Sequence, residues 1–234
     1  MKNLSNLSGL DGCSVKKYFV LFIISFTLSF TSQAQTGLFM RTQYWGNQLE
    51  ISWLFFTNDK KVIRNPKFGA DPLNIQKEMS QNSNNVATIT QLSGGKMSLT
   101  WGDGRKQTIN VEFKNGVLSA FDGGLCSKAT PFAFKFFQDK KYSGLASYGN
   151  VTRSVTMFLG KDGKFSTERL GSVSGSGNFS GAAAATGTDS GTYSIKGNTI
   201  IFKYNNGTEW IAVAQPYDLG KQDIIINDQR FKVE

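Results

Sequence analysis

The feature that most constrains the fold of this sequence is an internal repeat with a constant offset. Subtracting 103 from the positions of a turn, an aromatic residue and a second turn, Gly197, Tyr204 and Gly207, gives Gly94, Trp101 and Gly104. Far upstream, the same offset places Gly46, Phe55 and Asp59 on Gly149, Phe158 and Asp162. One register that holds without insertions over such a distance predicts an internal duplication.

The second copy indicates how the duplicated unit folds. Two alternating runs, Thr192 to Ile195 and Thr199 to Tyr204, flank a turn centred on Gly197, and a turn ending at Gly207 leads into a third run. This pattern is typical of a β-meander. We therefore predict an all-β fold of two repeated antiparallel β-meander units. Because each copy is rather short for a full eight-stranded barrel, two small barrels and one shared sandwich both remain open.

The two copies differ in the segment before the meander. In the first copy, Asp71 and Pro72 come directly before the stretch from Leu73 to Gln81. Asp is favoured as an N-cap and Pro at the first helical position, so this stretch predicts one short helix. In the second copy, residues 171–187 contain mainly Gly, Ser and Ala, which is typical of a flexible loop. That loop is either a lid over a pocket or a surface insertion.

The strand predicted from Leu49 to Phe56 is apolar on both faces. Ile51, Trp53 and Phe55 lie on one face, because side chains alternate along a strand. Leu54 lies on the opposite face. Such a strand needs cover on both sides, so we expect it at the contact between the two halves of the chain.

Residues 1–34 have the order of a secretory signal peptide. Two lysines precede an apolar run from Tyr18 to Phe30, which is shorter than the roughly 18 apolar residues that a membrane-spanning helix needs. Small residues at Ser32 and Ala34 predict cleavage after Ala34, and the alternative is an uncleaved amino-terminal anchor. We expect an exported protein, secreted or held in the periplasm or cell envelope, with no integral membrane span after cleavage.

The chain is basic, with 26 Lys and Arg residues against 17 Asp and Glu and a formal net charge of +9. No basic run is interleaved with aromatic residues, so we do not expect a nucleic-acid partner. Two turns are richer in lysine, one at Lys60 and Lys61 and the other at Lys161 and Lys164. These turns are candidates for contact with anionic polymers of a cell surface.

Residue counts exclude several kinds of catalytic and metal site. The chain has no histidine, which excludes Ser-His-Asp and Cys-His catalysis and His-ligated zinc or haem. Cys126 is the one cysteine outside the predicted signal peptide, and we expect it to be a small buried residue. No spacing singles out a catalytic pair among the acids on or beside strands, Glu50, Glu112, Glu168 and Glu209. We therefore predict no catalytic residues, no metal site and no cofactor.

Aromatic residues are the remaining candidates for a binding site. Tryptophan and tyrosine bring a large apolar surface with a polar tip, and the candidates are Trp45, Trp53, Trp101, Trp210, Tyr44, Tyr193 and Tyr204. Of these we single out Trp53, Trp101, Tyr204 and Trp210. Such residues suit a concave site for a lipid or a sugar ring. Trp101 and Tyr204 are equivalent in the repeat, which also fits a role in the cores of two β units.

Two pairs of segments resemble a known group of proteins. They are SWLFFTNDKKV with LSGGKMSLTWGDG in the first half, and TMFLGKDGKF with GTYSIKGNTIIFKYNNGTE in the second. These segments resemble the paired units of secreted bacterial β-rich proteins of unknown function, whose meanders are similar to lipocalin-like domains. The end of the signal segment, from Ser32 to Gln35, resembles those of Bacteroidetes. We place a first lipocalin-like repeat at 35–138 and a second at 139–234, after the signal peptide.

By analogy with that fold, the resemblance and the aromatic content imply a binding protein. We expect an exported, non-enzymatic binding module for a small apolar or amphipathic ligand. The alternative is a structural or adhesive protein of the cell envelope, whose basic turns contact anionic surface polymers. An enzyme with two acids across a cleft ranks third.

Overall fold

The computed structural model describes residues 35–46, 48–71, 73–131, 137–148, 151–170, 188–218 and 222–234. The predicted signal peptide at 1–34, the predicted helix residue Pro72 and the predicted loop at 171–187 lie outside the described residues. Within the described ranges, no helix combines the length and the apolar character needed to cross a membrane.

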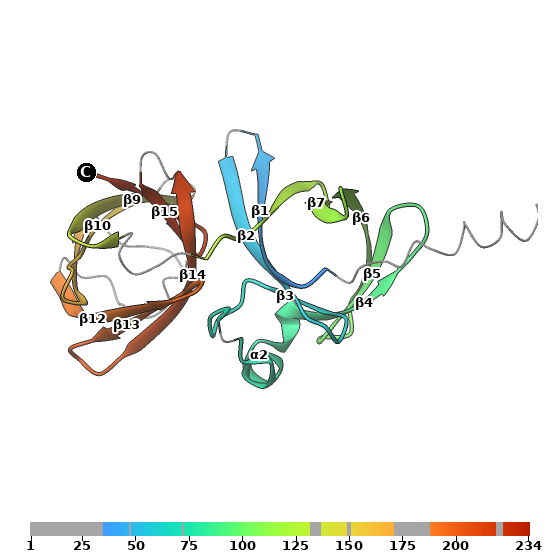
Figure 1. The fold of residues 1–234 in the computed structure, drawn as a ribbon, viewed down its shortest axis with the longest axis horizontal. Helices are drawn as coiled ribbons and strands as arrows, with labels where there is room; N and C mark the ends of the chain where they lie inside the picture. Colours follow the sequence, from blue (N-terminus) through green and yellow to red (C-terminus); the bar gives the residue numbers. More distant parts are fainter. Residues whose placement is uncertain are drawn as a thin grey trace, which may run out of the picture. The chain divides into compact units, whose positions relative to one another are not determined.

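The first half of the chain forms a closed antiparallel barrel of eight strands (Figure 1). In sequence order around the barrel these are β1 (Gly37–Trp45), β2 (Gln48–Phe56), β3 (Lys61–Arg64), β4 (Val86–Gln91), β5 (Lys96–Trp101), β6 (Lys106–Lys114), β7 (Val117–Phe121) and β8 (Gly124–Lys128). Between β3 and β4 lie the helix α2 (Ile75–Gln81) and the 3₁₀ turn η1 (Ser83–Asn85). β8 pairs with β1, where Arg41 lies opposite Cys126, so this sheet has no open edge.

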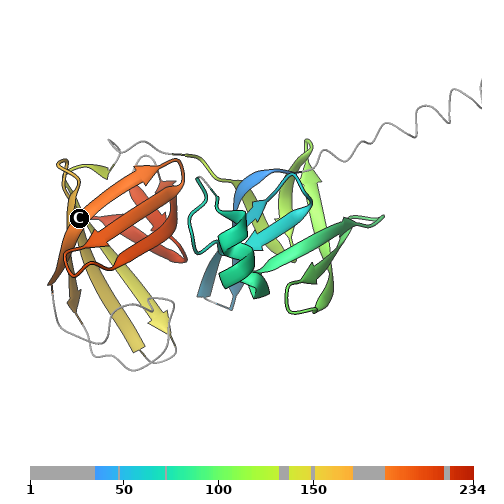
Figure 2. The ribbon, with the colours of Figure 1, turned by 90° about the horizontal axis from the view of Figure 1, so that it is seen from below.

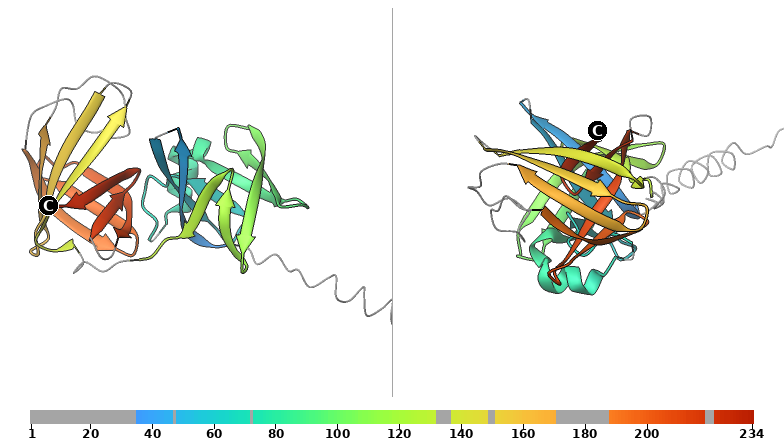
Figure 3. Two further views of the ribbon diagram at one scale, coloured as in Figure 1. Left: turned by 90° about the horizontal axis from the view of Figure 1, so that it is seen from above. Right: turned by 90° about the vertical axis from the view of Figure 1, so that its left-hand side faces the viewer.

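The second half forms another closed antiparallel barrel of eight strands. They are β9 (Lys140–Tyr148), β10 (Val151–Leu159), β11 (Lys164–Leu170), β12 (Thr188–Lys196), β13 (Thr199–Tyr204), β14 (Glu209–Asp218), β15 (Asp223–Ile226) and β16 (Gln229–Val233). β16 closes onto β9, where Phe231 lies opposite Gly144. Figure 3 shows this barrel from two further sides, with the hairpin of β9 and β10 in yellow to light orange.

The all-β fold of two repeated units is confirmed, and the two units are barrels rather than one shared sandwich. The expectation that each copy is rather short for eight strands is wrong. Tight turns explain the difference, because Asn115 and Gly116 alone connect β6 to β7, both with the positive φ of a type I′ hairpin. The predicted division after residue 138 falls between the end of β8 at Lys128 and the start of β9 at Lys140.

The offset of the repeat holds for whole strands. Adding 103 to the bounds of β1, β2 and β5 gives the bounds of β9, β10 and β13. By this offset, Arg41 on β1 is equivalent to Gly144 on β9. At the last strand the offset becomes 105, since β8 begins at Gly124 and β16 at Gln229, each directly after a two-residue turn. Gly124 and Gln229 are therefore equivalent.

The predicted short helix is present as α2, beside the strands of the first barrel (Figure 2). Its N-cap is Asn74, whose side chain accepts a hydrogen bond from the backbone N–H of Lys77, and not Asp71 as predicted. The backbone N–H of Asp71 instead donates to the hydroxyl of Thr199 at 2.8 Å. A tertiary contact therefore takes Asp71 away from the position that local preference favours.

Each barrel has a hydrophobic core, and a third cluster lies between them. Phe39 and Leu99 are fully buried in the first barrel, and Tyr142 and Leu159 in the second. Cores of this kind are the dominant stabilising contribution to small β domains.

The cluster between the barrels covers the outer face of β2. Ile51 and Trp53 pack there with Val213 and Ile225 of the second barrel. The indole N–H of Trp53 also donates to the backbone carbonyl of Asn227 at 2.5 Å. The expectation that β2 is covered on both faces at the contact between the two halves is confirmed.

Thr199 provides a first test of this contact. Its hydroxyl accepts hydrogen bonds from the backbone N–H groups of Ala70 and Asp71, each at 2.8 Å. We expect Thr199→Val to lower the free energy of unfolding by about 2 kcal/mol, because valine has a similar shape and leaves both donors unpaired. Urea unfolding followed by far-UV circular dichroism measures the change.

Thr192→Val is the matched control, because Thr192 is exposed on the neighbouring strand β12. Equal free energies of unfolding for the two variants would show that the Thr199 hydroxyl does not stabilise the contact.

Candidate functional site

A pocket of about 240 Å³ lies at one end of the first barrel. Its lining residues come from six strands, β1, β2, β3, β5, β6 and β7, and from Asp122 in the turn after β7. Arg41, Gln43 and Trp45 occupy alternate positions of β1, and their side chains therefore lie on one face of that strand. We refer to this site as the barrel-1 pocket.

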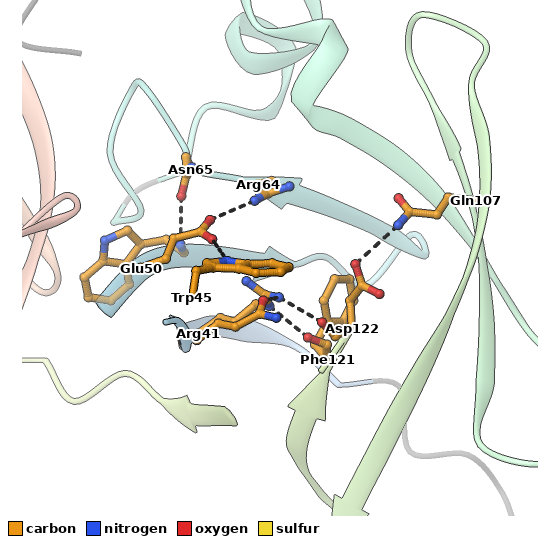
Figure 4. Close-up of polar contacts among 10 residues, drawn as sticks. Arg41, Trp45, Glu50, Arg64, Asn65, Gln107, Phe121 and Asp122 are labelled. Atoms are coloured by element: carbon orange, nitrogen blue, oxygen red, sulfur yellow. Dashed lines mark hydrogen bonds and ion pairs between the residues drawn. The ribbon is translucent and has the colours of Figure 1, made fainter. Parts of the chain in front are cut away.

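Arg41 is the least expected residue of the barrel-1 pocket, because its side chain is charged and only 6% exposed. Its Nε–H donates to the carbonyl of Phe121 at 2.8 Å, and one Nη donates to the carbonyl of Asp122 at 2.9 Å and to the side-chain oxygen of Gln43 (Figure 4). All three acceptors are neutral. In the part of the chain that the structure describes, no carboxylate lies within ion-pair distance of Arg41. A buried cation without a counter-ion is costly unless something else compensates it.

Gly124, at the start of β8, provides the space that Arg41 occupies. A Cβ atom at this position would lie 2.6 Å from Nε and 2.8 Å from Cζ of Arg41. Real Cβ contacts are not that short, and the backbone of Gly124 does not have a positive φ that would itself require glycine. The guanidinium can therefore occupy this position only because Gly124 has no side chain.

The second barrel reverses the sizes of these two residues. Gly144 stands where the first barrel has Arg41, and Gln229 stands where it has Gly124. A Cβ atom on Gly144 would lie 2.5 Å from Nε2 of Gln229, so here the large side chain comes from the eighth strand. The same barrel frame thus closes with a neutral amide, and the buried cation is not a requirement of the fold.

Trp45 stands at the mouth of the barrel-1 pocket and is 63% exposed. Its indole N–H donates to Oε2 of Glu50 at 2.8 Å, and Arg64 pairs with Oε1 of the same carboxylate at 3.2 Å (Figure 4). Three strands therefore hold the ring, since these residues lie on β1, β2 and β3. An exposed indole in a fixed orientation is a ready contact surface for a ligand.

Trp101 lies deeper, at the end of β5, and is 7% exposed. Its indole N–H is buried and has no hydrogen-bond partner among the described residues. A buried donor without an acceptor is uncommon in folded proteins. The guanidinium of Arg105 lies 5.9 Å from the ring of Trp101, a cation–π contact that leaves the N–H unpaired.

Two carboxylates also line the barrel-1 pocket, and both have partners. Both oxygens of Glu50 are bonded, to Trp45 and to Arg64. Asp122 accepts a hydrogen bond from the side chain of Gln107 at 3.3 Å. Asp122 has a φ of +49°, in the turn between β7 and β8, and its backbone carbonyl accepts from Arg41 while its carboxylate accepts from Gln107.

Cys126 lies opposite Arg41 in the pair of β1 and β8, and packs against the core of the first barrel. Burial raises the pKa of its thiol to about 11, and the nearby charge of Arg41 opposes that shift. The reactive thiolate is therefore scarce at neutral pH. The side chain is half-buried rather than fully buried, close to the small buried residue that we expected.

The structure distributes the four aromatic residues chosen from the sequence over three places. Trp101 lines the barrel-1 pocket, and Trp53 lies in the cluster between the barrels. Tyr204 and Trp210 pack against the core of the second barrel, where the ring of Trp210 stacks on Phe202 with centroids 5.1 Å apart. The four do not form one site.

Sequence reasoning missed Arg41, and it named Trp45 among the aromatic candidates without singling it out. Phe39, Arg41, Gln43 and Trp45 alternate along β1, so a single signal was present: a charged residue on the same face as a core phenylalanine. That signal was readable only once the inward face of the strand was known, because Leu38 and Met40 make the other face apolar too.

The basic turns of the envelope alternative have acidic partners close by. Lys61 pairs with Asp59, Lys161 with Asp139 at 3.7 Å and Lys164 with Asp162 at 3.2 Å. Of the strand-associated acids, Glu209 pairs with Lys203 at 3.8 Å. Among the described residues, no group of three or more Cys, Asp or Glu side chains could hold a metal ion.

Comparisons of the chain with protein-family models, with curated proteins and with solved structures find no match.

Gly124 and Arg41 can be tested by a double-mutant cycle. We expect Gly124→Ala to lower the free energy of unfolding by about 1–3 kcal/mol, because the new methyl group overlaps the guanidinium. In an Arg41→Ala background the same change should cost about 0.5 kcal/mol or less, since the space is then free. Urea unfolding of the four proteins measures the coupling, and an equal cost in both backgrounds would contradict the proposed contact.

The raised pKa of Cys126 gives a second prediction. In a chain that begins at Gln35, iodoacetamide should alkylate Cys126 slowly at pH 8, and the rate should rise about tenfold per pH unit towards pH 10, because only the thiolate reacts. The same chain unfolded in urea should level off near pH 9.5, above the ordinary thiol pKa of about 8.5. A plateau at that pH in the folded protein would contradict the raised pKa.

Proposed function

We propose that this protein is an exported, non-enzymatic binding protein that holds a small amphipathic ligand in the barrel-1 pocket. The observation that carries the proposal is the combination of three side chains around one cavity. They are the exposed indole of Trp45, the buried indole ring of Trp101 and the buried guanidinium of Arg41. Concave sites with aromatic walls and a few polar groups are typical of small-ligand binding.

The size of the cavity favours a small ligand, or one that inserts only its end. Its volume of about 240 Å³ is below the roughly 300–1,000 Å³ of pockets for drug-sized molecules. Leu54, Leu99 and Phe121 are buried residues of the barrel core that also line the cavity. An amphipathic ligand would therefore meet both apolar and polar groups in one cavity.

The chemistry of the cavity supports binding rather than catalysis. Glu50 and Asp122 both have hydrogen-bond partners, and Glu50 is further neutralised by Arg64. The nearby thiol of Cys126 has a raised pKa, so it is a poor nucleophile at neutral pH. The proposal of export rests on the order of residues 1–34, which is that of a signal peptide.

Intrinsic tryptophan fluorescence tests the proposed binding. Residues 35–234 form one compact unit that contains every described strand, so a chain beginning at Gln35 is a suitable protein. We expect a saturable change in emission on titration with medium-chain fatty acids, the corresponding alcohols or apolar dyes, at about one ligand per chain. The change should be reduced in Trp45→Phe and in Trp101→Phe.

Trp210→Phe is the matched control, because Trp210 packs against the core of the second barrel, and its substitution should leave the ligand-induced change intact. The absence of any saturable change across the panel, in a protein whose far-UV spectrum shows it to be folded, would overturn the proposal.

A further inference from the structure

We infer that the ligand of the barrel-1 pocket carries a carboxylate, and that Arg41 binds it. This inference rests on the proposed function and names the chemical class of the ligand. It follows from the charge of Arg41, from the donors that remain unpaired in the pocket and from the comparison of the two barrels.

The hydrogen bonds of Arg41 leave part of its guanidinium without a partner. An arginine side chain has five N–H donors. In Arg41 the Nε–H and the two N–H groups of Nη2 meet the carbonyls of Phe121 and Asp122 and the side chain of Gln43. The two N–H groups of Nη1 have no acceptor among the described residues. A carboxylate is the partner that such a planar donor set binds best.

Trp101 also lines this cavity. Its buried indole N–H also lacks an acceptor among the described residues. The described lining of the pocket therefore offers the unpaired donors of Arg41, and the carboxylate of Glu50 has both oxygens occupied. An acceptor that brings a negative charge would pair these donors and neutralise the buried cation at once.

The second barrel serves as an internal control for this inference. At the equivalent place it has Gly144 and Gln229, with no charge, and it closes into the same eight-stranded frame. Arg41 is thus present for a reason other than barrel closure. Glycine at position 124 accompanies Arg41, because a residue with a Cβ atom would leave no room for the guanidinium.

A single negative charge fits the pocket better than a phosphate. Asp122 also lines the pocket, and its carboxylate would repel an anion. One guanidinium opposite one acidic side chain is a weak site for a dianion, which proteins usually hold with several backbone N–H groups or several cations. A monocarboxylate with a short apolar tail would pair with the charge of Arg41 and would fit the small volume of the pocket.

Paired titrations with octanoate and 1-octanol test the inference, because the two probes share a tail and differ in the charged group. Tryptophan fluorescence measures the affinity of the chain from Gln35 for each probe. We expect the wild type to bind octanoate about tenfold more tightly than 1-octanol. Arg41→Gln should remove this preference, and Asp122→Asn should increase the affinity for octanoate severalfold without changing that for 1-octanol.

Lys232→Gln is the matched control, because it removes one positive charge from an exposed position of β16 and should leave the preference unchanged. Equal binding of the two probes by the wild type, or a preference that persists in folded Arg41→Gln, would overturn the inference and leave the proposed binding function intact. If Arg41→Gln does not fold, an unchanged preference in Asp122→Asn overturns it instead. Binding of neither probe, nor of any other member of the panel, would overturn the proposed function itself.

Discussion

The first barrel depends on the pairing of β1 with β8, which joins its first strand to its last and leaves the sheet without a free edge. The same seam builds the pocket. Arg41 on β1 reaches the carbonyls of Phe121, the last residue of β7, and of Asp122, which follows it, and Gly124 at the start of β8 leaves the space for its guanidinium. Without closure, Arg41 would lose both its acceptors and its burial. The stability of the barrel and the geometry of the site therefore come from one set of strand contacts.

The duplicated halves show how one frame can carry different chemistry. Both barrels have eight strands in sequence order, and the offset of 103 residues matches their strands almost one to one. The first places a large charged side chain on its first strand and glycine on its eighth, Arg41 and Gly124. The second has Gly144 and Gln229 instead, and both polar atoms of the Gln229 amide are buried without partners among the described residues. Exchange of the large and the small residue between neighbouring strands keeps one long side chain at this place while it changes the charge. A close-packed interior tolerates substitutions that roughly conserve volume.

The contact between the barrels follows from a strand that is apolar on both faces. Leu54 faces the core of the first barrel, while Trp53 packs in the cluster shared with the second. Hydrogen bonds add to that contact, because the hydroxyl of Thr199 accepts from two backbone N–H groups of the segment before α2 and so holds this segment against the second barrel. That is also why the helix begins later than its sequence suggests: Asp71 is held by the second barrel, and Asn74 caps the helix.

The sequence by itself determined the duplication, the β-meander, the two-sided cover of β2 and the absence of histidine chemistry. These depend on residue identity, on the alternation of neighbouring residues and on turns of two or three residues, which are properties of contiguous segments. Only the tertiary structure decided that each copy closes with eight strands, and that Trp53 lies in the cluster between the barrels while Trp101 lines a pocket. It also decided that Arg41 faces inward, because the carbonyl that it binds belongs to Phe121, 80 residues away in the sequence. The pocket therefore forms only when strands that are distant in the sequence pair with each other.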